Sequence, residues 1–403
     1  MIDQKIIADC ERKLKHCFET LDDVCLFNQE KVLNAFKKNK IALRHFSGTT
    51  GYGYGDDGRD ALNALFADIF GAEDAVCSPA IVSGTHALAA CLFGILRPGN
   101  TVLSITGEPY DTLSNVIRGK DVGSLQDLGI RFETIPLTDG NFDKDAISTR
   151  LKRSDVNMVY LQRSRGYDWR NALSLCEIES IVDFLRKDCS FEGCIMTDNC
   201  YGEFIDKREP AEVGVNLVAG SMIKNPGGGI APTGGYVAGD KKYVDLVRNR
   251  LTAPAIGGEV GSYYNGYQYF YQGLFIAPHV VKEAVKGAML FSSVFSELGY
   301  DTLPHRYEIP NDIITSVKFG DKDKLVAFMQ TVQENSPIDS FVSVMPWDMP
   351  GYEDQVIMAA GCFVQGASIE LSADAPIRPP YTAYLQGGLT YEHCKIVLKN
   401  MKL

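Results

Sequence analysis

The chain has 403 residues, of which 45% are apolar and 23% are charged. These fractions are typical of a soluble globular protein and argue against a disordered chain, while the length predicts two structural parts around a large core. The net charge of −11 argues against a protein that works by binding nucleic acid or an anionic membrane, so we expect a small-molecule partner.

The sequence also lacks signals for export, membrane insertion and metal binding. No apolar run approaches the length of a membrane span, and Met1–Lys5 lack the apolar core of a signal peptide, so we expect a cytoplasmic protein. The eleven cysteines are scattered without a Cys-x-x-Cys pair, and the six histidines show no metal-ligand spacing. We therefore expect reduced thiols and no metal.

The first segment is predicted to be a helical arm that ends in a glycine-rich loop. Residues 1 to about 45 are expected to be helical, because Val32, Leu33, Phe36 and Ile41 recur near helical spacing. Ser47–Gly55 follows with four glycines in nine residues, which predicts a loop held by close contacts. Loops of this kind often carry functional residues.

Residues 60–255 alternate short apolar runs with amphipathic stretches, which predicts βαβ units. Such units build a mostly parallel sheet covered by helices, so the expected fold class is α/β. The predicted strands are Ala75–Ser78, Thr101–Ile105, Val156–Leu161, Cys194–Thr197, Leu217–Met222 and Gly235–Ala238. The predicted helices are Ala87–Leu96, Glu177–Arg186 and Lys241–Arg250.

The C-terminal part is predicted to form a connecting helix and a smaller α+β domain. The apolar periodicity of Pro278–Leu298 indicates the connecting helix. The remaining predicted elements are the strands Ile313–Phe319, Phe341–Val344 and Ala367–Leu371 and the helices Lys322–Val332 and Tyr391–Met401. The expected organisation is an arm and loop at 1–58, a large domain at 59–275, and the connecting helix with the small domain at 276–403.

A candidate anion site precedes the first helix of the large domain. Ser83-Gly84-Thr85-His86 opens an apolar helix, so its backbone N–H groups are expected to point out of the helix N-terminus. The glycine permits a phosphate to approach the backbone closely, and the two hydroxyl groups can donate further hydrogen bonds. The alternative is that these residues only cap the helix.

Two strand ends carry candidate reactive groups. Asp198 ends a very apolar strand at the sheet edge where open α/β sheets bind ligands, and a protonated pyridine nitrogen is one partner for a buried carboxylate. Lys224 ends another apolar strand, where a desolvated lysine loses proton affinity and becomes a nucleophile toward an aldehyde. The alternatives are an aspartate that forms a turn and an exposed lysine.

The three elements are more specific together than singly. Asp198 and Lys224 lie 224 − 198 = 26 positions apart, which is about one crossover plus one strand. We therefore expect both side chains to reach one ring from neighbouring strands.

With these residues the chain resembles the fold-type I pyridoxal-phosphate enzymes, particularly the cysteine and methionine metabolism group that contains cystathionine lyases and methionine γ-lyase. Asp198-Asn199-x-Tyr201 is similar to that group's Asp-Asn-Thr strand end, and Ser221-x-x-Lys224 is similar to its Ser-x-Thr-Lys site. The chain is similar over nearly its whole length to the branch called methionine γ-lyase-like or aluminium-resistance proteins, most clearly in 162–167, 224–235 and 385–390. Ile223 departs from the group's threonine, and the Ser-Leu-Gly segment near its substrate arginine is absent.

The resemblance implies a fold-type I architecture, pyridoxal 5'-phosphate as cofactor and a role for each motif. Lys224 would form the Schiff base, Asp198 would pair with the pyridine nitrogen, and Tyr110 would stack on the ring. The implied phosphate contacts are Ser83, Gly84, Thr85 and Ser221. In related enzymes a Tyr and an Arg reach the neighbouring subunit's phosphate, which would make Tyr52 or Tyr54, with Arg59, part of a shared site in a homodimer or homotetramer. The alternative for these three residues is loop packing.

Arg378 is the candidate for the substrate carboxylate, because a planar guanidinium matches a carboxylate with two hydrogen bonds. Arg163 and Arg165 are further candidates, and a surface arginine is the alternative. The expected function is an amino-acid lyase that cleaves a carbon–sulfur bond by β- or γ-elimination. An aminotransferase or aldolase would need the same core residues, and a metal-tolerance protein without enzymatic activity is a third alternative.

Overall fold

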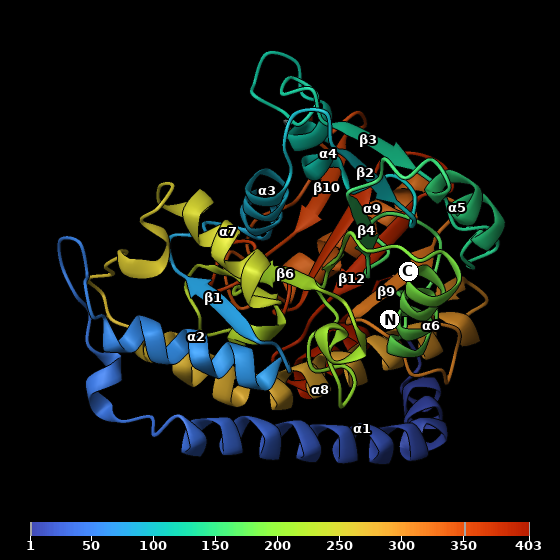
Figure 1. The fold of residues 1–403 in the computed structure, drawn as a ribbon. Coiled ribbons are helices and arrows are strands. Elements are labelled where there is room, and N and C mark those ends of the chain that lie inside the picture. The colour runs from blue at the N-terminus through green and yellow to red at the C-terminus, as the bar shows by residue number, and fades with distance from the viewer. Residues whose placement is uncertain (1, 350–351, 403) are drawn as a thin grey trace.

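The computed structural model describes residues 2–349 and 352–402, and its centre is a seven-stranded sheet (Figure 1). The strands lie in the order β1-β7-β6-β5-β4-β2-β3, in which β7 runs antiparallel to both neighbours and the other pairs are parallel. Their bounds are β1 Asp74–Ser78, β2 Thr101–Ser104, β3 Arg131–Thr134, β4 Met158–Gln162, β5 Cys194–Asp198, β6 Leu217–Ser221 and β7 Gly235–Gly239.

Helices cover both faces of this sheet, because its inner strands are apolar on both sides. Cys194 and Ile195 are neighbours in β5, and both are buried, yet they belong to two separate hydrophobic clusters. One cluster includes residues of α3, α4 and α7, and the other includes residues of α2, α5 and α6. The bounds are α2 Asp57–Ile69, α3 Gly84–Ile95, α4 Asp111–Arg118, α5 Lys144–Leu151, α6 Leu175–Asp183 and α7 Lys241–Leu251.

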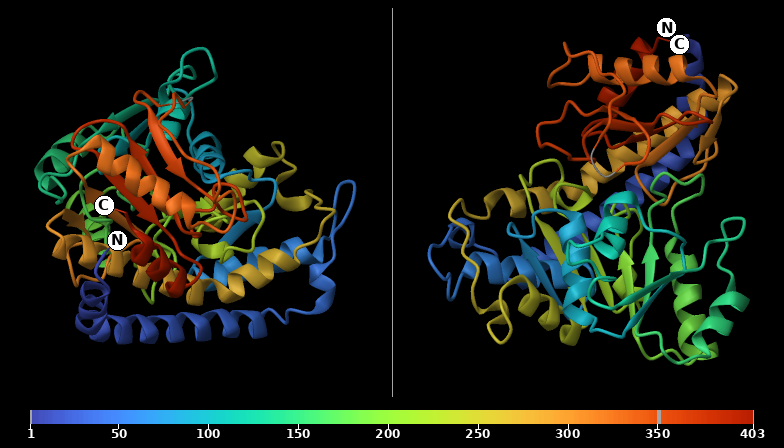
Figure 2. Two further views of the ribbon diagram at one scale, coloured as in Figure 1. Left: turned by 180° about the vertical axis from the view of Figure 1, so that it is seen from behind. Right: turned by 90° about the horizontal axis from the view of Figure 1, so that it is seen from above.

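A second, five-stranded sheet lies above the first, and it is orange and red in the right-hand view of Figure 2. Its order is β10-β11-β12-β9-β8, and each neighbouring pair is antiparallel. The elements are β8 Asp301–Leu303, β9 Ile314–Lys318, α9 Lys322–Glu334, β10 Val356–Ala359, β11 Ser372–Pro376, β12 Thr382–Gln386 and α10 Tyr391–Asn400. The fold is the mostly parallel sheet with flanking helices and a smaller C-terminal part that the sequence predicts.

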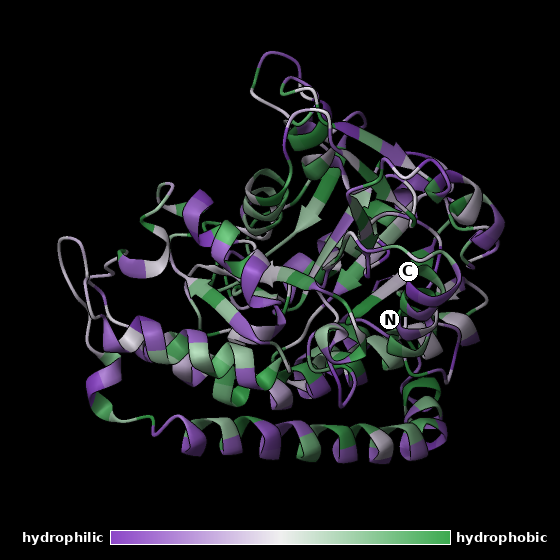
Figure 3. Ribbon diagram, in the orientation of Figure 1, coloured by the Kyte–Doolittle hydropathy of each residue, from purple (hydrophilic) through white to green (hydrophobic). Residues whose placement is uncertain are grey.

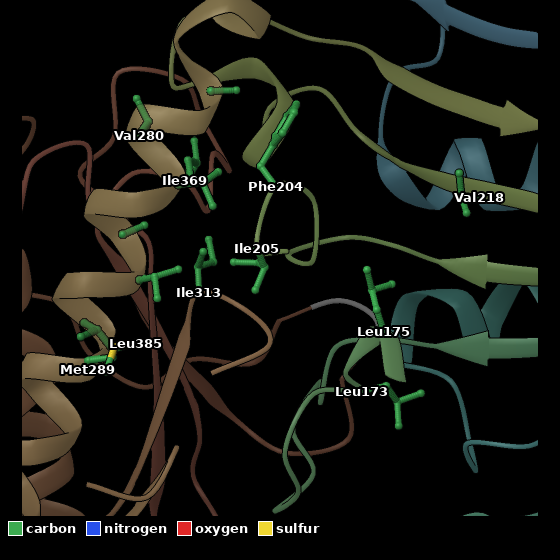
Figure 4. Close-up of a cluster of buried hydrophobic side chains, with 14 of the residues drawn as sticks. Leu173, Leu175, Phe204, Ile205, Val218, Val280, Met289, Ile313, Ile369 and Leu385 are labelled. Atoms are coloured by element: carbon green, nitrogen blue, oxygen red, sulfur yellow. The ribbon is translucent and has the colours of Figure 1, made fainter. Parts of the chain in front are cut away.

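Two long helices, α1 (Gln4–Lys38) and α8 (Gln268–Glu297), run side by side along the molecule (Figure 1). Polar and apolar residues alternate along α1 in Figure 3, and Asp22 on its polar side pairs with Lys286 of α8 at 2.5 Å. Figure 4 shows Val280 and Met289 of α8 beside Ile369 and Leu385 of the small-sheet region. The apolar side of α8 therefore helps to hold the small sheet over the large one.

Most predicted elements are confirmed to within a few residues at their ends, and the missed ones have a physical reason. The strand β3 was not predicted, because its sequence Arg-Phe-Glu-Thr is short and half exposed at the sheet edge and so carries no apolar run. The predicted connecting helix begins at Gln268 rather than Pro278. Proline favours a first turn, but here tertiary packing buries Pro278 inside the helix.

Three local predictions are wrong. The first helix ends at Lys38, so Ile41 lies outside it. The segment 341–344 is irregular, and Phe341 is 87% exposed, so its apolar side chains do not enter a sheet. Ala367–Leu371 is also irregular, although Ile369 and Leu371 are buried, because strand pairing starts only at Ser372. The spacing of apolar residues in the sequence did not distinguish a buried loop from a strand.

Within residues 2–349 and 352–402, no helix combines the length and the apolar character that crossing a membrane requires.

Candidate active site

A cleft of about 920 Å³ lies between the carboxyl ends of β4, β5 and β6 and one face of the small sheet. In open α/β sheets, ligands bind at this edge. The structure brings seven of the predicted site residues together in the lining of this one cleft: Ser83, Gly84, Thr85, Tyr110, Asp198, Ser221 and Lys224. Arg165 and Arg378 also line it, whereas Tyr52, Tyr54, Arg59 and Arg163 do not.

Asp198 is the last residue of β5, and its carboxylate is buried at the bottom of the cleft. The backbone N–H of Cys200 donates to its Oδ1 at 3.1 Å. Burial raises the pKa of this carboxyl, and the positive charge of Lys224 opposes that rise. Since β5 and β6 are neighbours in the sheet, the prediction that Asp198 and Lys224 follow adjacent strands is confirmed.

Lys224 follows the end of β6, and its Nζ lies 4.0 Å from the centre of the Tyr201 ring. Burial acts to lower the pKa of this ammonium, but the neighbouring Cys200, Tyr201 and Asp198 raise that pKa above its ordinary value. Tyr201 itself has a positive φ of 71°, an uncommon backbone conformation outside glycine.

The glycine run after Lys224 fixes the position of the lysine against α8. A Cβ atom on Gly227 would lie 1.8 Å from the carbonyl oxygen of Met222, and one on Gly273 would lie 2.2 Å from that of Gly227. Such contacts are impossible, so larger residues would push the loop away from α8. The backbone next to Lys224 is thus held by direct packing on a core helix.

The predicted anion site lies at the N-terminus of α3. The Ser83 hydroxyl caps the helix by accepting from the His86 N–H at 3.1 Å, and N–H groups in the first turn of a helix have no intrahelical acceptor. Gly84 lies so close to the end of β6 that a Cβ atom on it would be 3.4 Å from that of Ser221. The Thr85 hydroxyl lies 2.9 Å from that of Tyr110.

The residues present fit pyridoxal phosphate. A buried carboxylate suits a protonated pyridine nitrogen, a lysine beside it suits the aldehyde, and the start of α3 suits the phosphate dianion. Tyr110 immediately precedes α4 and its N–H donates to Gln162 Oε1 at 3.1 Å, and the residue lines the cleft, where its ring can stack on a flat cofactor.

The candidate arginines for the substrate carboxylate differ in how many of their hydrogen bonds go to other protein groups. Arg163 lies outside the cleft, fully buried, and donates to Asn199 and to two backbone carbonyls, so its role is structural and not substrate binding. Arg165 lines the cleft but forms a buried ion pair with Asp312 at 3.0 Å. Arg378 lines the cleft with a half-exposed side chain, and it pairs with Asp354 through one hydrogen bond of 3.0 Å.

The glycine-rich loop lies away from the cleft of its own chain. Tyr52 and Tyr54 are 72% and 68% exposed, and their rings pack against each other at 5.5 Å. Arg59 is buried and donates to the Gly53 carbonyl at 3.0 Å. The loop also binds a second segment, because the Gly261 N–H donates to the Tyr52 carbonyl at 2.9 Å.

Three functional candidates in the cleft were missed in the sequence. Arg170 donates to the carbonyl oxygens of Gln162 and Ser164, and within the described residues its buried Nε finds no hydrogen-bond partner. Asp374 reaches the cleft from β11, and Tyr201 lies beside Lys224. The presence of three arginines within residues 163–170 could have pointed to Arg170 in the sequence. Nothing in the local sequence indicated that β11 would face Lys224.

A buried carboxyl lies behind the site. Glu203 follows β5, and its Oε1 accepts from the Tyr236 hydroxyl at 2.8 Å. Its backbone carbonyl accepts from the Asn225 side chain at 3.0 Å, next to Lys224. Burial raises the pKa of Glu203 to about 8. At neutral pH this carboxyl is therefore largely protonated.

The raised pKa of Glu203 predicts how the free energy of unfolding depends on pH. Because the pKa of Glu203 in the folded protein lies above its ordinary value of 4.5, its contribution to the free energy of unfolding is complete below pH 4.5 and is lost as pH rises through about 8. We expect Glu203→Gln to remove this loss, so that the variant gains stability relative to the parent as pH rises from 5 to 8.5. Denaturant unfolding across this range measures the difference. Glu179→Gln, at an exposed ion pair, is the control, and parallel curves for the parent and Glu203→Gln would refute the prediction.

The fold and the cleft define the chain as a fold-type I pyridoxal-phosphate protein, since strand ends and a helix start supply the three groups that the cofactor requires. A pyridoxal-5'-phosphate-dependent protein from Escherichia coli shares this fold at 15% identity, with a TM-score of 0.63 over 94% of this chain and 96% of that one.

The chain belongs to the methionine gamma-lyase family, whose model matches residues 3–402, and this family uses pyridoxal phosphate. The uncharacterized protein YnbB of Bacillus subtilis (strain 168) is 45% identical over 396 residues, which are 97% of this chain and 94% of YnbB. A crystal structure from Clostridium novyi NT, described as a carbon-sulfur lyase involved in aluminum resistance, is 50% identical, with a TM-score of 0.95 over 99% of this chain and 96% of that chain.

Proposed function

We propose that the protein is a pyridoxal-phosphate-dependent lyase that breaks a carbon–sulfur bond of an amino acid by β- or γ-elimination. The observation that carries the proposal is the cleft in which Lys224 and Asp198 meet at neighbouring strand ends. The description of the Clostridium novyi protein as a carbon-sulfur lyase supports the choice of bond. Related structures from Listeria innocua and Clostridium acetobutylicum are described as candidate cystathionine beta-lyases.

In this proposal Lys224 and Asp198 have separate roles in the reaction. The bound cofactor supplies an electron sink for the carbanion formed at the substrate α-carbon. Lys224 Nζ takes the α-proton as general base, and the Asp198 carboxylate keeps the pyridine nitrogen protonated. The sulfur leaves with the electrons of the broken bond and receives a proton as a thiol. Addition of water to the remaining unsaturated amine gives a keto acid and ammonia.

Arg378 and Arg170 are the two residues of the cleft wall that we propose to bind the substrate carboxylate. Arg378 has only one hydrogen bond to Asp354, so part of its guanidinium is available to a ligand. Arg170 pairs with backbone carbonyls and not with a carboxylate. A guanidinium of either residue can hold a carboxylate with two hydrogen bonds.

Incubation of the holoenzyme with cystathionine, methionine and cysteine tests the reaction. We expect at least one of them to yield keto acid and ammonia in equal amounts together with a thiol. If none does, and an amino donor instead converts the cofactor to its amine form, the protein is an aminotransferase. If a hydroxy amino acid is split to an aldehyde, it is an aldolase.

The related structures are described as involved in aluminum resistance. We propose that a role of this protein in such resistance would come from its enzymatic reaction and not from direct binding of the ion. Within residues 2–349 and 352–402, no group of three or more His, Cys, Asp or Glu residues is placed to hold a metal ion. Tight stoichiometric aluminium binding in equilibrium dialysis would contradict this view.

We also propose that the active form is a homodimer, or a homotetramer built from such dimers. The exposed Tyr52 and Tyr54 and the neighbouring Tyr264, which is 81% exposed, support an intersubunit role for the loop. Arg59 would join them at the phosphate of the partner's site. A monomer in light scattering of the active holoenzyme would refute this proposal.

A further inference from the structure

One face of the small sheet forms a polar wall of the cleft. Asp374 of β11 and Tyr384 of β12 lie directly opposite each other in the antiparallel ladder. Gln386 lies two positions further along β12, and side chains two apart in a strand point to the same face. All three line the cleft, so this face is directed toward the substrate and not toward α8 or α9.

The carboxylate of Asp374 forms no salt bridge among residues 2–349 and 352–402, although the positive charge of Lys224 opposes the effect of burial on its pKa. Its hydrogen bond comes from the Gln386 amide, whose Nε2 donates to Oδ2 at 3.0 Å. None of the arginines that line the cleft pairs with it: Arg165 is paired with Asp312, Arg378 is paired with Asp354, and Arg170 donates to the backbone carbonyls of Gln162 and Ser164. Burial raises the pKa of Asp374 to about 6, so the group is ionised at neutral pH. A half-buried carboxylate in this position gains from a cation supplied by a ligand.

Aromatic rings surround the same position. Tyr167 packs against Tyr384 with ring centres 5.0 Å apart and against Tyr352 at 6.2 Å, and all three rings line the cleft. Tyr384 lies opposite Asp374 in the ladder, so these rings gather next to the carboxylate, and burial followed by the negative charge of Asp374 raises the pKa of Tyr167 and of Tyr352. Tyrosine rings attract a cation through their faces, and a carboxylate among them adds a charge partner.

We propose that Asp374, together with Tyr167, Tyr352 and Tyr384, forms a subsite for an ammonium group on the substrate side chain. The enzyme then prefers amino acids that carry a second positive charge beyond the sulfur, as cystathionine does and methionine does not. This inference rests on the proposed function, because it places an amino acid in the cleft. It differs from a role in holding Lys224, which would affect every amino acid alike.

Two unreactive amino acids test the subsite without turnover. Ornithine and norleucine are nearly equal in shape and carry no β or γ leaving group, but only ornithine has a side-chain ammonium. Titration of the holoenzyme with each, followed by the absorbance of the bound cofactor, gives both dissociation constants. We expect ornithine to bind about 10-fold to 100-fold more tightly, the value of a hydrogen bond to a charged group. Asp374→Asn should remove most of this preference and leave norleucine binding unchanged, which also shows that the variant is folded.

Asp139→Asn is the matched control, because it removes one negative charge from an exposed position at the rim of the same cleft. It should keep the preference for ornithine. The inference is overturned if the parent enzyme binds both amino acids equally, or if Asp374→Asn weakens both to the same extent. In those cases amino-acid binding, and with it the proposed function, still stands. If neither amino acid changes the cofactor absorbance, the proposed function fails together with the inference.

Discussion

Replacing Lys224 with Ala is expected to lower the rate of elimination by at least about 1,000-fold, because the change removes both the nucleophile for the cofactor aldehyde and the general base. Lys224 lies over the Tyr201 ring and shares the cleft with Asp198, and no other lysine lines the cleft in the described part of the chain. Borohydride treatment followed by mass spectrometry should find the cofactor covalently attached to a peptide of the parent enzyme and to none of the variant.

Two further variants separate the roles of Lys224. Lys224→Arg keeps the positive charge near Asp198 but removes the amine, so it should behave like the alanine variant in activity and in borohydride labelling. Lys241→Ala, at an exposed position of α7, should behave like the parent. Cofactor attachment at a different lysine, or activity of Lys224→Ala within 10-fold of the parent, would disprove the assignment.

Asp198→Asn is expected to lower kcat/KM by about 100-fold to 1,000-fold, the cost of losing one charge placed to stabilise a transition state. Asparagine has the same shape and keeps the hydrogen bond from Cys200, but it cannot balance a protonated pyridine nitrogen. The variant removes a carboxylate whose burial is unfavourable without the cofactor, so the apoprotein should remain folded.

Kinetics with the best sulfur amino acid and cofactor affinity by equilibrium dialysis measure this effect. Asp198→Glu keeps the charge and should lose less activity than Asp198→Asn. Asp183→Asn removes a surface carboxylate of α6 and serves as the control. Equal losses for the Glu and Asn variants would show that shape matters at this position and that charge does not.

Much of the fold was predictable because its large sheet is buried on both faces. Strands such as β4, β5 and β6 are continuous apolar runs between polar segments, so their positions follow from the sequence. The small sheet was harder. The segment 367–371 alternates apolar and polar residues and is buried without being a strand. The strands β8, β10, β11 and β12 were missed, because the apolar spacing of short segments does not reveal their partners.

The residues expected to bind the cofactor were predicted from the sequence, whereas the residues of the cleft walls were not. A strand-end aspartate, a strand-end lysine and a capped helix start are local patterns, and parallel strands bring such patterns to one edge. Arg163, Arg165 and Arg170 look alike in the sequence. Only the structure shows that the first two are engaged by protein groups while the Nε of Arg170 finds no partner in the described residues.

The sequence by itself determined the cofactor chemistry of this protein. Lys224, Asp198 and the start of α3 each sit at the end of a regular element, where local pattern fixes both residue and direction. The tertiary structure alone decided what faces them. Asp374 and Tyr384 reach the cleft because α8 holds the small sheet over the large one, and that placement depends on packing between segments far apart in the chain. If the proposed subsite is right, substrate specificity depends on contacts between distant segments, whereas the reactive groups stand where local sequence patterns place them.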